Sequence, residues 1–264
     1  MKRLLIVFLS SFLILPFALP AYPQEDTKEA ESLFVAQKAF DDGFYDVALS
    51  LLERFIKNYP ASDKTSDVNL LIGRCYFQES RFLDALKQFE DLLEVPSARK
   101  IKDAVLFWIA EVHFRGNIFP KAAKYYKQII DEFPHSPYTA SAYYSLGWCL
   151  SQEGRYAEAL ENFKLLEQKF PGEQQSRDSA FKIIECLYNL KEYARLKERL
   201  KSCMKDCKDD PVKLSHLSYY LGEADYYLED YSGAVEQYQR TDSLSQDPKI
   251  KTLARLGLAW SYVK

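Results

Sequence analysis

The sequence predicts an all-α fold in which pairs of helices stack into an elongated solenoid, and three recurring features support this prediction. An aromatic residue recurs at intervals of 37 or 38 residues along the 264-residue chain, and Ala follows it three positions later in five of six instances. A large apolar residue or tyrosine stands four positions after that site. The recurring aromatic residues are Tyr45, Phe82, Phe119, Tyr156, Tyr193 and Tyr231. We expect each of them to open the second helix of a helix pair.

One complete pair is written in residues 141–171. Gly147 lies in its first helix, Gly154 marks the turn, and Tyr156 opens the second helix, which Pro171 then ends. The remaining elements follow by sliding this segment along the chain. We expect units at about 29–60, 66–96, 103–134, 140–171, 177–207 and 215–241, with a partial unit at 250–264.

The fifth unit and the partial unit depart from this pattern. Leu196 and Ile184 replace the small residues of the fifth unit, so we expect its packing to differ locally. The partial unit repeats the first-helix pattern, with Gly257 and Trp260, and no second helix follows. This last helix is either a terminal cap or part of a longer array. Its almost continuously apolar sequence favours a fragment of a longer array, because a cap presents a polar outer face.

The pattern resembles the tetratricopeptide repeat (TPR), a helix-turn-helix unit of about 34 residues in which a small residue lets the two helices approach closely. Gly73, Gly147, Gly222 and Gly257 stand at this small position of the first helix. The longer units are similar to those of two bacterial envelope families, the outer-membrane assembly lipoprotein of the barrel-assembly complex and the Tol-Pal cell division coordinator. The resemblance implies a right-handed α-solenoid of about six TPR-like units plus a final helix. It also implies a scaffold that binds protein partners.

The resemblance further implies that first-helix side chains line a concave groove. Most side chains at the fifth, ninth and twelfth positions of these helices are aromatic or charged. The predicted groove residues are Leu33, Phe40, Leu70, Arg74, Phe77, Phe107, Glu111, Phe114, Tyr144, Trp148, Phe181, Tyr188, Tyr219, Glu223 and Tyr226. Two interpretations remain open. The stripe either packs successive first helices together, as apolar stripes usually do, or it accepts an extended or helical segment of a partner.

The first 21 residues break the repeat and predict a secretory signal peptide. Lys2 and Arg3 precede an apolar run from Leu4 to Leu15, and we expect cleavage after Ala21. An uncleaved anchor is the alternative, because residues 4–22 approach the length of a membrane span. Residues 22–28 then form a polar leader. The first cysteine is Cys75, so the lipid attachment of the lipoprotein family is not expected, and the favoured location is the periplasm or the exterior of the cell.

Composition and motifs exclude several functions. Lys and Arg number 35 against 38 Asp and Glu, a net charge of −3, and no basic stripe is present to bind nucleic acid. The three histidines lie in different units without an HExxH motif, and neither a glycine-rich phosphate loop nor a Gly-x-Ser-x-Gly motif occurs. We therefore expect no catalytic, cofactor or metal site.

Five cysteines in an exported protein raise the question of disulfides. Cys75, Cys149 and Cys186 share one repeat position, and equivalent points on stacked helices are roughly 8 to 10 Å apart, too far for a bridge. We expect these three to be buried as small apolar residues. Cys203 and Cys207 are four residues apart, so a bridge between them would distort the helix end, and their redox state stays open.

The sequence thus favours a non-catalytic scaffold of the periplasm or cell envelope that binds protein partners through its groove, acting in envelope assembly or maintenance. Two alternatives remain. The chain could be the TPR receptor part of a longer secreted or envelope protein, or an enzyme with an unrecognised site. Fold by itself does not decide among them.

Overall fold

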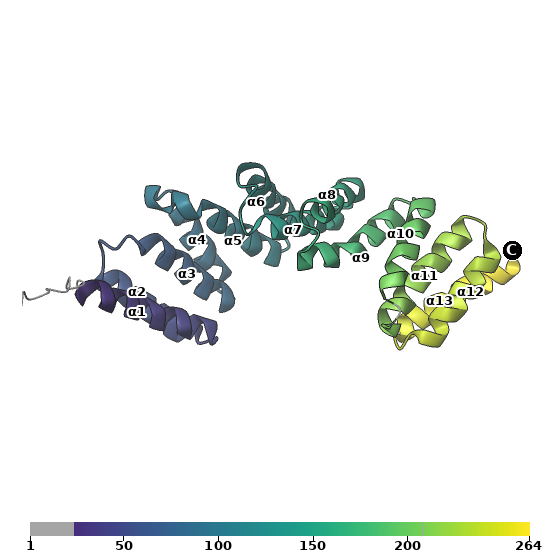
Figure 1. Ribbon diagram of the computed structural model, residues 1–264, viewed down its shortest axis with the longest axis horizontal. Helices are drawn as coiled ribbons and strands as arrows, with labels where there is room; N and C mark the ends of the chain where they lie inside the picture. The colour runs from purple at the N-terminus through teal and green to yellow at the C-terminus, as the bar shows by residue number, and fades with distance from the viewer. Residues whose placement is uncertain (1–23, 208) are drawn as a thin grey trace, which may run out of the picture.

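The computed structural model describes residues 24–207 and 209–264, and over these residues it contains α-helices, one 3₁₀ helix and no strand. Six helix pairs and a final helix confirm the predicted fold class (Figure 1). The helices are α1 (Gln24–Asp41), α2 (Tyr45–Asn58), α3 (Thr65–Gln78), α4 (Phe82–Leu93), η1 (Pro96–Ile101), α5 (Lys102–Arg115), α6 (Phe119–Glu132), α7 (Thr139–Gln152), α8 (Tyr156–Lys169), α9 (Gln174–Asn189), α10 (Tyr193–Asp206), α11 (Pro211–Tyr227), α12 (Tyr231–Leu244) and α13 (Pro248–Val263). The predicted signal peptide lies outside the described residues, and residues 24–28 of the predicted leader form the start of α1.

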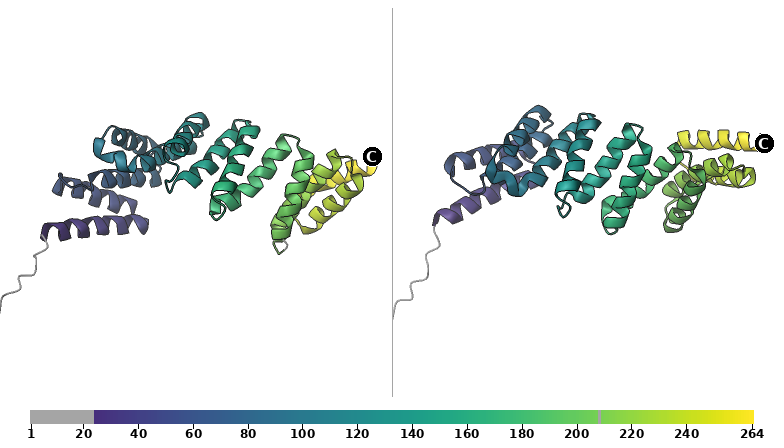
Figure 2. Two further views of the ribbon diagram at one scale, coloured as in Figure 1. Left: turned by 45° about the horizontal axis from the view of Figure 1, so that its top comes forward. Right: turned by 90° about the horizontal axis from the view of Figure 1, so that it is seen from above.

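The helix pairs follow one another along an elongated, arched array. In Figure 1 both ends lie below the middle, and α3, α5 and α7 lie on the inner side of α4, α6 and α8. The turned views in Figure 2 show the same succession, with α1 at one end and α13 at the other. We refer to α1/α2 through α11/α12 as units one to six, and to the odd-numbered helices as first helices. In the middle of the array the first helices α3, α5 and α7 therefore line the inner side of the arch.

Each second helix begins at the aromatic residue that the repeat predicts, from Tyr45 in α2 to Tyr231 in α12. The turn before it is equally regular. Gly43 and Gly154 have positive φ angles of 83° and 75°, and the equivalent residue of every other unit also adopts the left-handed conformation. These residues are Ser80, Asn117, Lys191 and Glu229. The turn geometry is thus kept where glycine is absent, although left-handed φ is costly for other residues.

Small and large residues complement each other inside the units. A Cβ atom added to Gly147 would lie 2.7 Å from the Phe163 ring, and one added to Gly73 would lie 2.3 Å from the Phe89 ring. Glycine is required there because the aromatic ring occupies the space of its missing side chain. In unit five Leu200 replaces the ring and Ile184 replaces the glycine, and both are fully buried. The packing of unit five therefore differs as predicted: the first-helix side chain is larger and the facing second-helix side chain is smaller than in units two and four.

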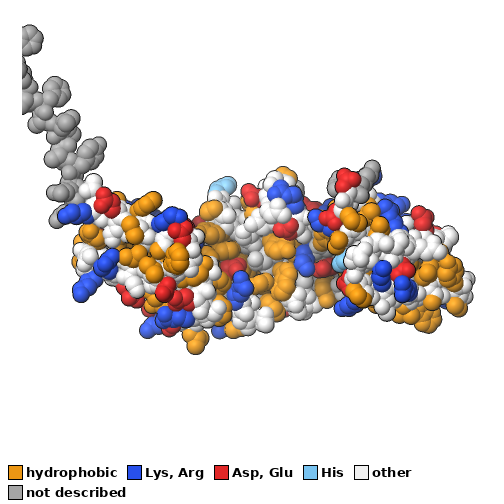
Figure 3. Space-filling model, turned by 90° about the horizontal axis from the view of Figure 1, so that it is seen from below, with side chains coloured by type: hydrophobic (Ala, Val, Ile, Leu, Met, Phe, Trp, Pro, Cys, Tyr) orange, Lys and Arg blue, Asp and Glu red, His pale blue; other side chains and the backbone are white. Residues whose placement is uncertain are grey.

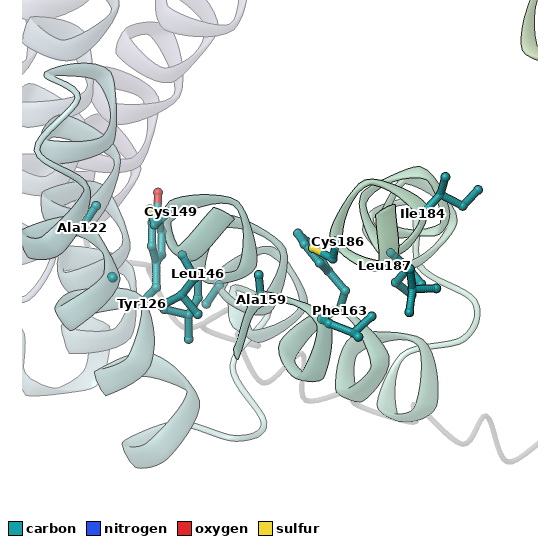
Figure 4. Close-up of a cluster of buried hydrophobic side chains, with 14 of the residues drawn as sticks. Ala122, Tyr126, Leu146, Cys149, Ala159, Phe163, Ile184, Cys186 and Leu187 are labelled. Atoms are coloured by element: carbon teal, nitrogen blue, oxygen red, sulfur yellow. The ribbon is translucent and has the colours of Figure 1, made fainter. Parts of the chain in front are cut away.

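Buried side chains join the units into clusters along the array. The largest cluster runs from Leu106 to Ala224 and is fully apolar except for its tyrosine hydroxyl groups. Figure 4 shows members of this cluster, from Ala122 to Leu187, projecting into the spaces between successive helices. The core is therefore distributed along the solenoid, as expected for a repeat array.

Two of the loops between units, after α2 and after α6, are fastened to the preceding first helix. Ser62 Oγ donates to Glu29 Oε1 at 2.5 Å, and Ser136 Oγ donates to Asp103 Oδ2 at 2.6 Å. Each serine also accepts from the backbone N–H two residues later. These bonds give the extra residues of the 37-residue period a fixed conformation.

Cys75, Cys149 and Cys186 carry free thiols in the structure. Cys75, Cys149 and Cys186 are buried, which confirms the prediction that they pack as small apolar residues. Burial raises the pKa of the Cys75 and Cys149 thiols to about 12, so both stay protonated at neutral pH and are poor nucleophiles.

Candidate functional site

The first helices from α3 to α11 each bury one face, and a strip of half-buried side chains runs beside that face. In α5, Leu106 and Ile109 are buried whereas Phe107, Glu111 and Phe114 are half-buried. The same positions are half-buried in α7, α9 and α11. We call these positions, the fifth, ninth and twelfth of each first helix, the groove strip. Among the predicted groove residues only Phe40 and Phe77 are buried, each 7% exposed.

Aromatic side chains connect the strip from one unit to the next. The ring centroids of Phe77 and Trp108 are 5.3 Å apart, and those of Phe114 and Trp148 are 4.9 Å apart. Farther along, Tyr188 and Tyr220 contact each other at 5.4 Å. Within the described residues no ring contact joins α7 to α9, so the aromatic strip has an N-terminal and a C-terminal section. Figure 3 shows the lower face of the arch, where hydrophobic side chains recur from end to end between charged ones.

The N-terminal section contains a cation without a counter-ion. The Arg74 guanidinium lies between two rings, with its Cζ atom 4.6 Å from the Phe40 centroid and 5.2 Å from the Trp108 centroid. Its Nε atom is buried without a hydrogen-bond partner, and no carboxylate pairs with Arg74 in the described part of the chain. Stacking on the two rings holds the planar guanidinium in place without a carboxylate partner.

The C-terminal section contains an anion surrounded by tyrosines. Tyr238 donates a hydrogen bond to Glu223 Oε1 at 2.7 Å, and Tyr188 donates to Glu223 Oε2 at 2.8 Å. Burial and the nearby Glu223 carboxylate raise the pKa of both tyrosines, so both remain neutral donors at pH 7. Tyr219 and Tyr226 lie beside them. The carboxylate is thus fixed by neighbours from units five and six.

Glu111, the third charged residue among the predicted groove residues, is hydrogen-bonded within its own unit. Tyr126 Oη donates to Glu111 Oε1 at 2.6 Å. Burial raises the pKa of the Glu111 carboxyl, and the hydrogen bond and nearby Arg115 oppose this shift. Glu111 therefore acts inside the unit, where it satisfies the buried Tyr126 hydroxyl group.

Comparison with known proteins identifies the repeat. A family model described as "Tetratricopeptide repeat" matches residues 36–101, 70–137 and 119–173. The chain belongs to the tetratricopeptide repeat family. TPR proteins bind protein or peptide partners, and the fold is typically an interaction scaffold. No curated protein matches the sequence.

Solved TPR structures share the fold at low sequence identity. RapI in its apo form has a TM-score of 0.72 at 13% identity, covering 91% of this chain and 72% of RapI. YrrB, described as a TPR protein with an unusual peptide-binding site, has a TM-score of 0.62 at 13% identity, covering 77% of this chain and 97% of YrrB. PilF of Pseudomonas aeruginosa has a TM-score of 0.61 at 13% identity, covering 91% of this chain and 99% of PilF. At such identities the likeness concerns the fold alone.

Two predicted residues of the TPR array lie beside hollows of their own. Leu33 lies beside a hollow between α1 and α3, together with Phe34 and Leu71. Phe181 borders a hollow of about 530 Å³ formed by α8 to α11, where Arg199 pairs with Glu167 beside Cys203. The structure therefore does not bring all the predicted residues together at one site.

Several aromatic residues beside the strip were missed by the sequence analysis. Trp108, Tyr220 and Tyr227 each follow a predicted residue directly, and they widen the strip by one position. Aromatic doublets such as Tyr219-Tyr220 were a usable signal. Tyr138 stacks on Phe107 at 4.7 Å from outside the predicted positions, and no sequence signal marked it.

Among the described residues, no group of three or more His, Cys, Asp or Glu side chains could hold a metal ion. His113 is buried and its ring stacks on Tyr125, so it packs within unit three. None of the described helices is long and apolar enough to cross a membrane.

Proposed function

We propose that this TPR protein is a non-catalytic scaffold of the bacterial cell envelope that binds a segment of a protein partner along the groove strip. The observation that carries the proposal is the groove strip itself. Beside the buried face of the first helices runs a strip of half-buried side chains that is rich in aromatic residues from α3 to α11. Aromatic side chains are favoured anchors in binding sites.

The packing of these anchors supports binding at low entropic cost. Phe114 contacts Phe119, Tyr126 and Trp148, so its rotamer is restricted before any partner arrives. A side chain that is already ordered loses little conformational entropy on binding. An extended or helical segment would meet a rigid surface whose period matches the repeat.

The charged groups of Arg74 and Glu223, which neighbouring rings and hydroxyl groups hold in place, support a polar contribution to recognition. Arg74 offers guanidinium donors without a carboxylate partner, so it suits an acidic side chain or a chain terminus. The YrrB structure is described as having a peptide-binding site, and the shared fold makes a peptide segment a reasonable ligand class here.

The location is proposed from the sequence. Lys2 and Arg3 followed by an apolar run support export, and the longer repeat units resemble those of envelope proteins. We propose that cleavage after Ala21 releases the TPR array into the periplasm.

A site-specific photocrosslinking experiment in the envelope tests both parts of this proposal. p-Benzoylphenylalanine is placed at Phe114, in the groove strip, and separately at Leu83, an 84%-exposed position on α4. We expect crosslinks to a partner from position 114 and none from position 83. Arg74→Ala should weaken that capture roughly five- to thirty-fold, as loss of a binding anchor typically does.

The same preparation reports on export. Mass spectrometry of the periplasmic protein should find Tyr22 as its first residue. Crosslinks that form only from position 83 would contradict the groove, and a protein that retains Met1 in the membrane fraction would contradict cleavage and release.

A further inference from the structure

The helices α11, α12 and α13 line an open hollow of about 460 Å³ at the C-terminal end of the groove strip. Tyr219, Glu223, Tyr226 and Tyr227 line it from α11. The other lining residues are Tyr238 from α12 and Leu253, Leu256, Gly257 and Trp260 from α13. Glu223 is the only charged residue in this lining. The hollow therefore combines one carboxylate with a wall of aromatic and aliphatic side chains.

The carboxylate of Glu223 has no cation beside it in the described residues. Both its oxygens accept hydrogen bonds from tyrosines, which fix its position and leave further lone pairs free. The equivalent residue of unit five, Glu185, differs because Lys182 pairs with it at 2.8 Å. In unit three Glu111 accepts from Tyr126, near Arg115. Glu223 is thus the ninth-position glutamate that borders a hollow and lacks a counter-ion.

The aromatic walls add to the preference for a cation. Tyr226 and Tyr227 meet edge to face at 5.6 Å, and Tyr227 is 52% exposed at the edge of the hollow. Trp260 is 56% exposed and lines the hollow from α13. The faces of tyrosine and tryptophan rings attract cations, and this attraction is largest where water is partly excluded.

We propose that this hollow binds a lysine side chain of the partner segment. The ammonium group interacts with the Glu223 carboxylate and the aromatic faces, and the four-carbon stem packs on Leu253 and Leu256. Lysine fits this arrangement because its charge is a compact ammonium at the end of an apolar chain. This inference rests on the proposed function, since it assigns one side chain of the segment that the groove strip binds.

Fluorine NMR of the full protein labelled with 5-fluorotryptophan tests the inference. The labelled residues are Trp108, Trp148 and Trp260, and a Trp260→Phe variant assigns the Trp260 resonance. Titration with Nα-acetyl-lysine amide should shift the Trp260 resonance saturably. The neutral analogue, Nα-acetyl-norleucine amide, should bind about tenfold more weakly because it lacks the charge.

Three variants complete the experiment. Glu223→Gln keeps an acceptor for the tyrosines and should weaken lysine-amide binding about tenfold. Glu236→Gln, which removes one negative charge at an exposed position on α12 outside the hollow, should leave it unchanged. Tyr227→Leu removes an exposed wall residue and should also weaken binding, with the melting temperature of each variant as a folding control. Equal binding of the lysine and norleucine probes, or unchanged binding by Glu223→Gln, would overturn the inference.

Failure of this inference is distinguishable from failure of the proposed function. If position 114 crosslinks to a partner but the lysine probe shows no preference over norleucine, only the lysine site is wrong. If the lysine probe binds as expected but position 114 captures no partner, the groove function is wrong and the cation site stands.

Discussion

The ring of Phe163 packs so closely on Gly147 that it leaves no room for a side chain there, and this gives a prediction for a single residue. Gly147→Ala places a Cβ atom 2.7 Å from that ring, so we expect about 1–3 kcal/mol of lost stability, as for other overpacked cores. Gly172→Ala is the matched control, because a Cβ atom there meets nothing within 4 Å. Chemical denaturation measures both. Equal stability of the two variants would contradict the packing argument. Adding Phe163→Leu to the Gly147→Ala variant should restore part of the lost stability, because a smaller side chain then faces the new Cβ atom.

Glu111 gives a prediction about pH. Burial raises the pKa of its carboxyl in the folded protein, so the folded state holds this proton more tightly than the unfolded state does. The charged form therefore costs stability at neutral pH, and the cost disappears as the pH falls through the raised pKa. Glu111→Gln keeps an acceptor for Tyr126 and should raise the melting temperature at pH 7, with the gain shrinking towards pH 4.

Thermal unfolding of this variant between pH 4 and pH 8 measures the effect. Glu161→Gln, at an exposed position on α8, controls for the loss of one negative charge. A gain that stays constant over this range, or a loss at pH 7, would show that the Tyr126 bond and Arg115 outweigh burial at Glu111.

At the scale of the element, Phe77 and Phe114 occupy the same position of α3 and α5 but differ in burial. Phe77 is 7% exposed and belongs to a buried cluster with Phe89 and Ile109, which agrees with the packing interpretation of the stripe. Phe114 is half-buried, as a groove residue would be. Phe77→Ala should cost on the order of 3–5 kcal/mol. Phe114→Ala should cost less and should weaken partner capture.

Denaturation of the two variants, together with crosslinking from Tyr144, measures both effects. A loss of more than about 3 kcal/mol for Phe114→Ala would mean that this position is also core. The binding surface would then lie elsewhere on the array.

At the scale of the whole molecule, stability should be a sum of local terms, because each unit packs only on its neighbours. Leu196→Ala removes a fully buried side chain of α10 and should cost about 2–5 kcal/mol locally. We expect faster amide hydrogen exchange in α9 to α11 and unchanged protection in α3 and α4. A uniform loss of protection over the described helices would instead indicate one cooperative unit.

The sequence by itself determined the fold, the register of the repeat units and the start of every second helix, because the same residue pattern recurs in each of the six units. The aromatic spacing from Tyr45 to Tyr231 predicted where each second helix begins. The same repeat register identified the fifth, ninth and twelfth positions of the first helices, which form the groove strip. These are local properties of helix period and turn chemistry, which a linear pattern carries.

Only the tertiary structure decided what surrounds each predicted residue. Arg74, Glu111, Glu185 and Glu223 share one repeat position, yet one is stacked between rings, one serves its own unit, one is ion-paired and one borders an open hollow. The differences come from neighbours on adjacent helices, such as Trp108 and Tyr188, which lie more than thirty residues away along the chain. A repeat pattern specifies which positions of each first helix are equivalent, whereas burial and charge pairing depend on contacts between units that no single unit contains.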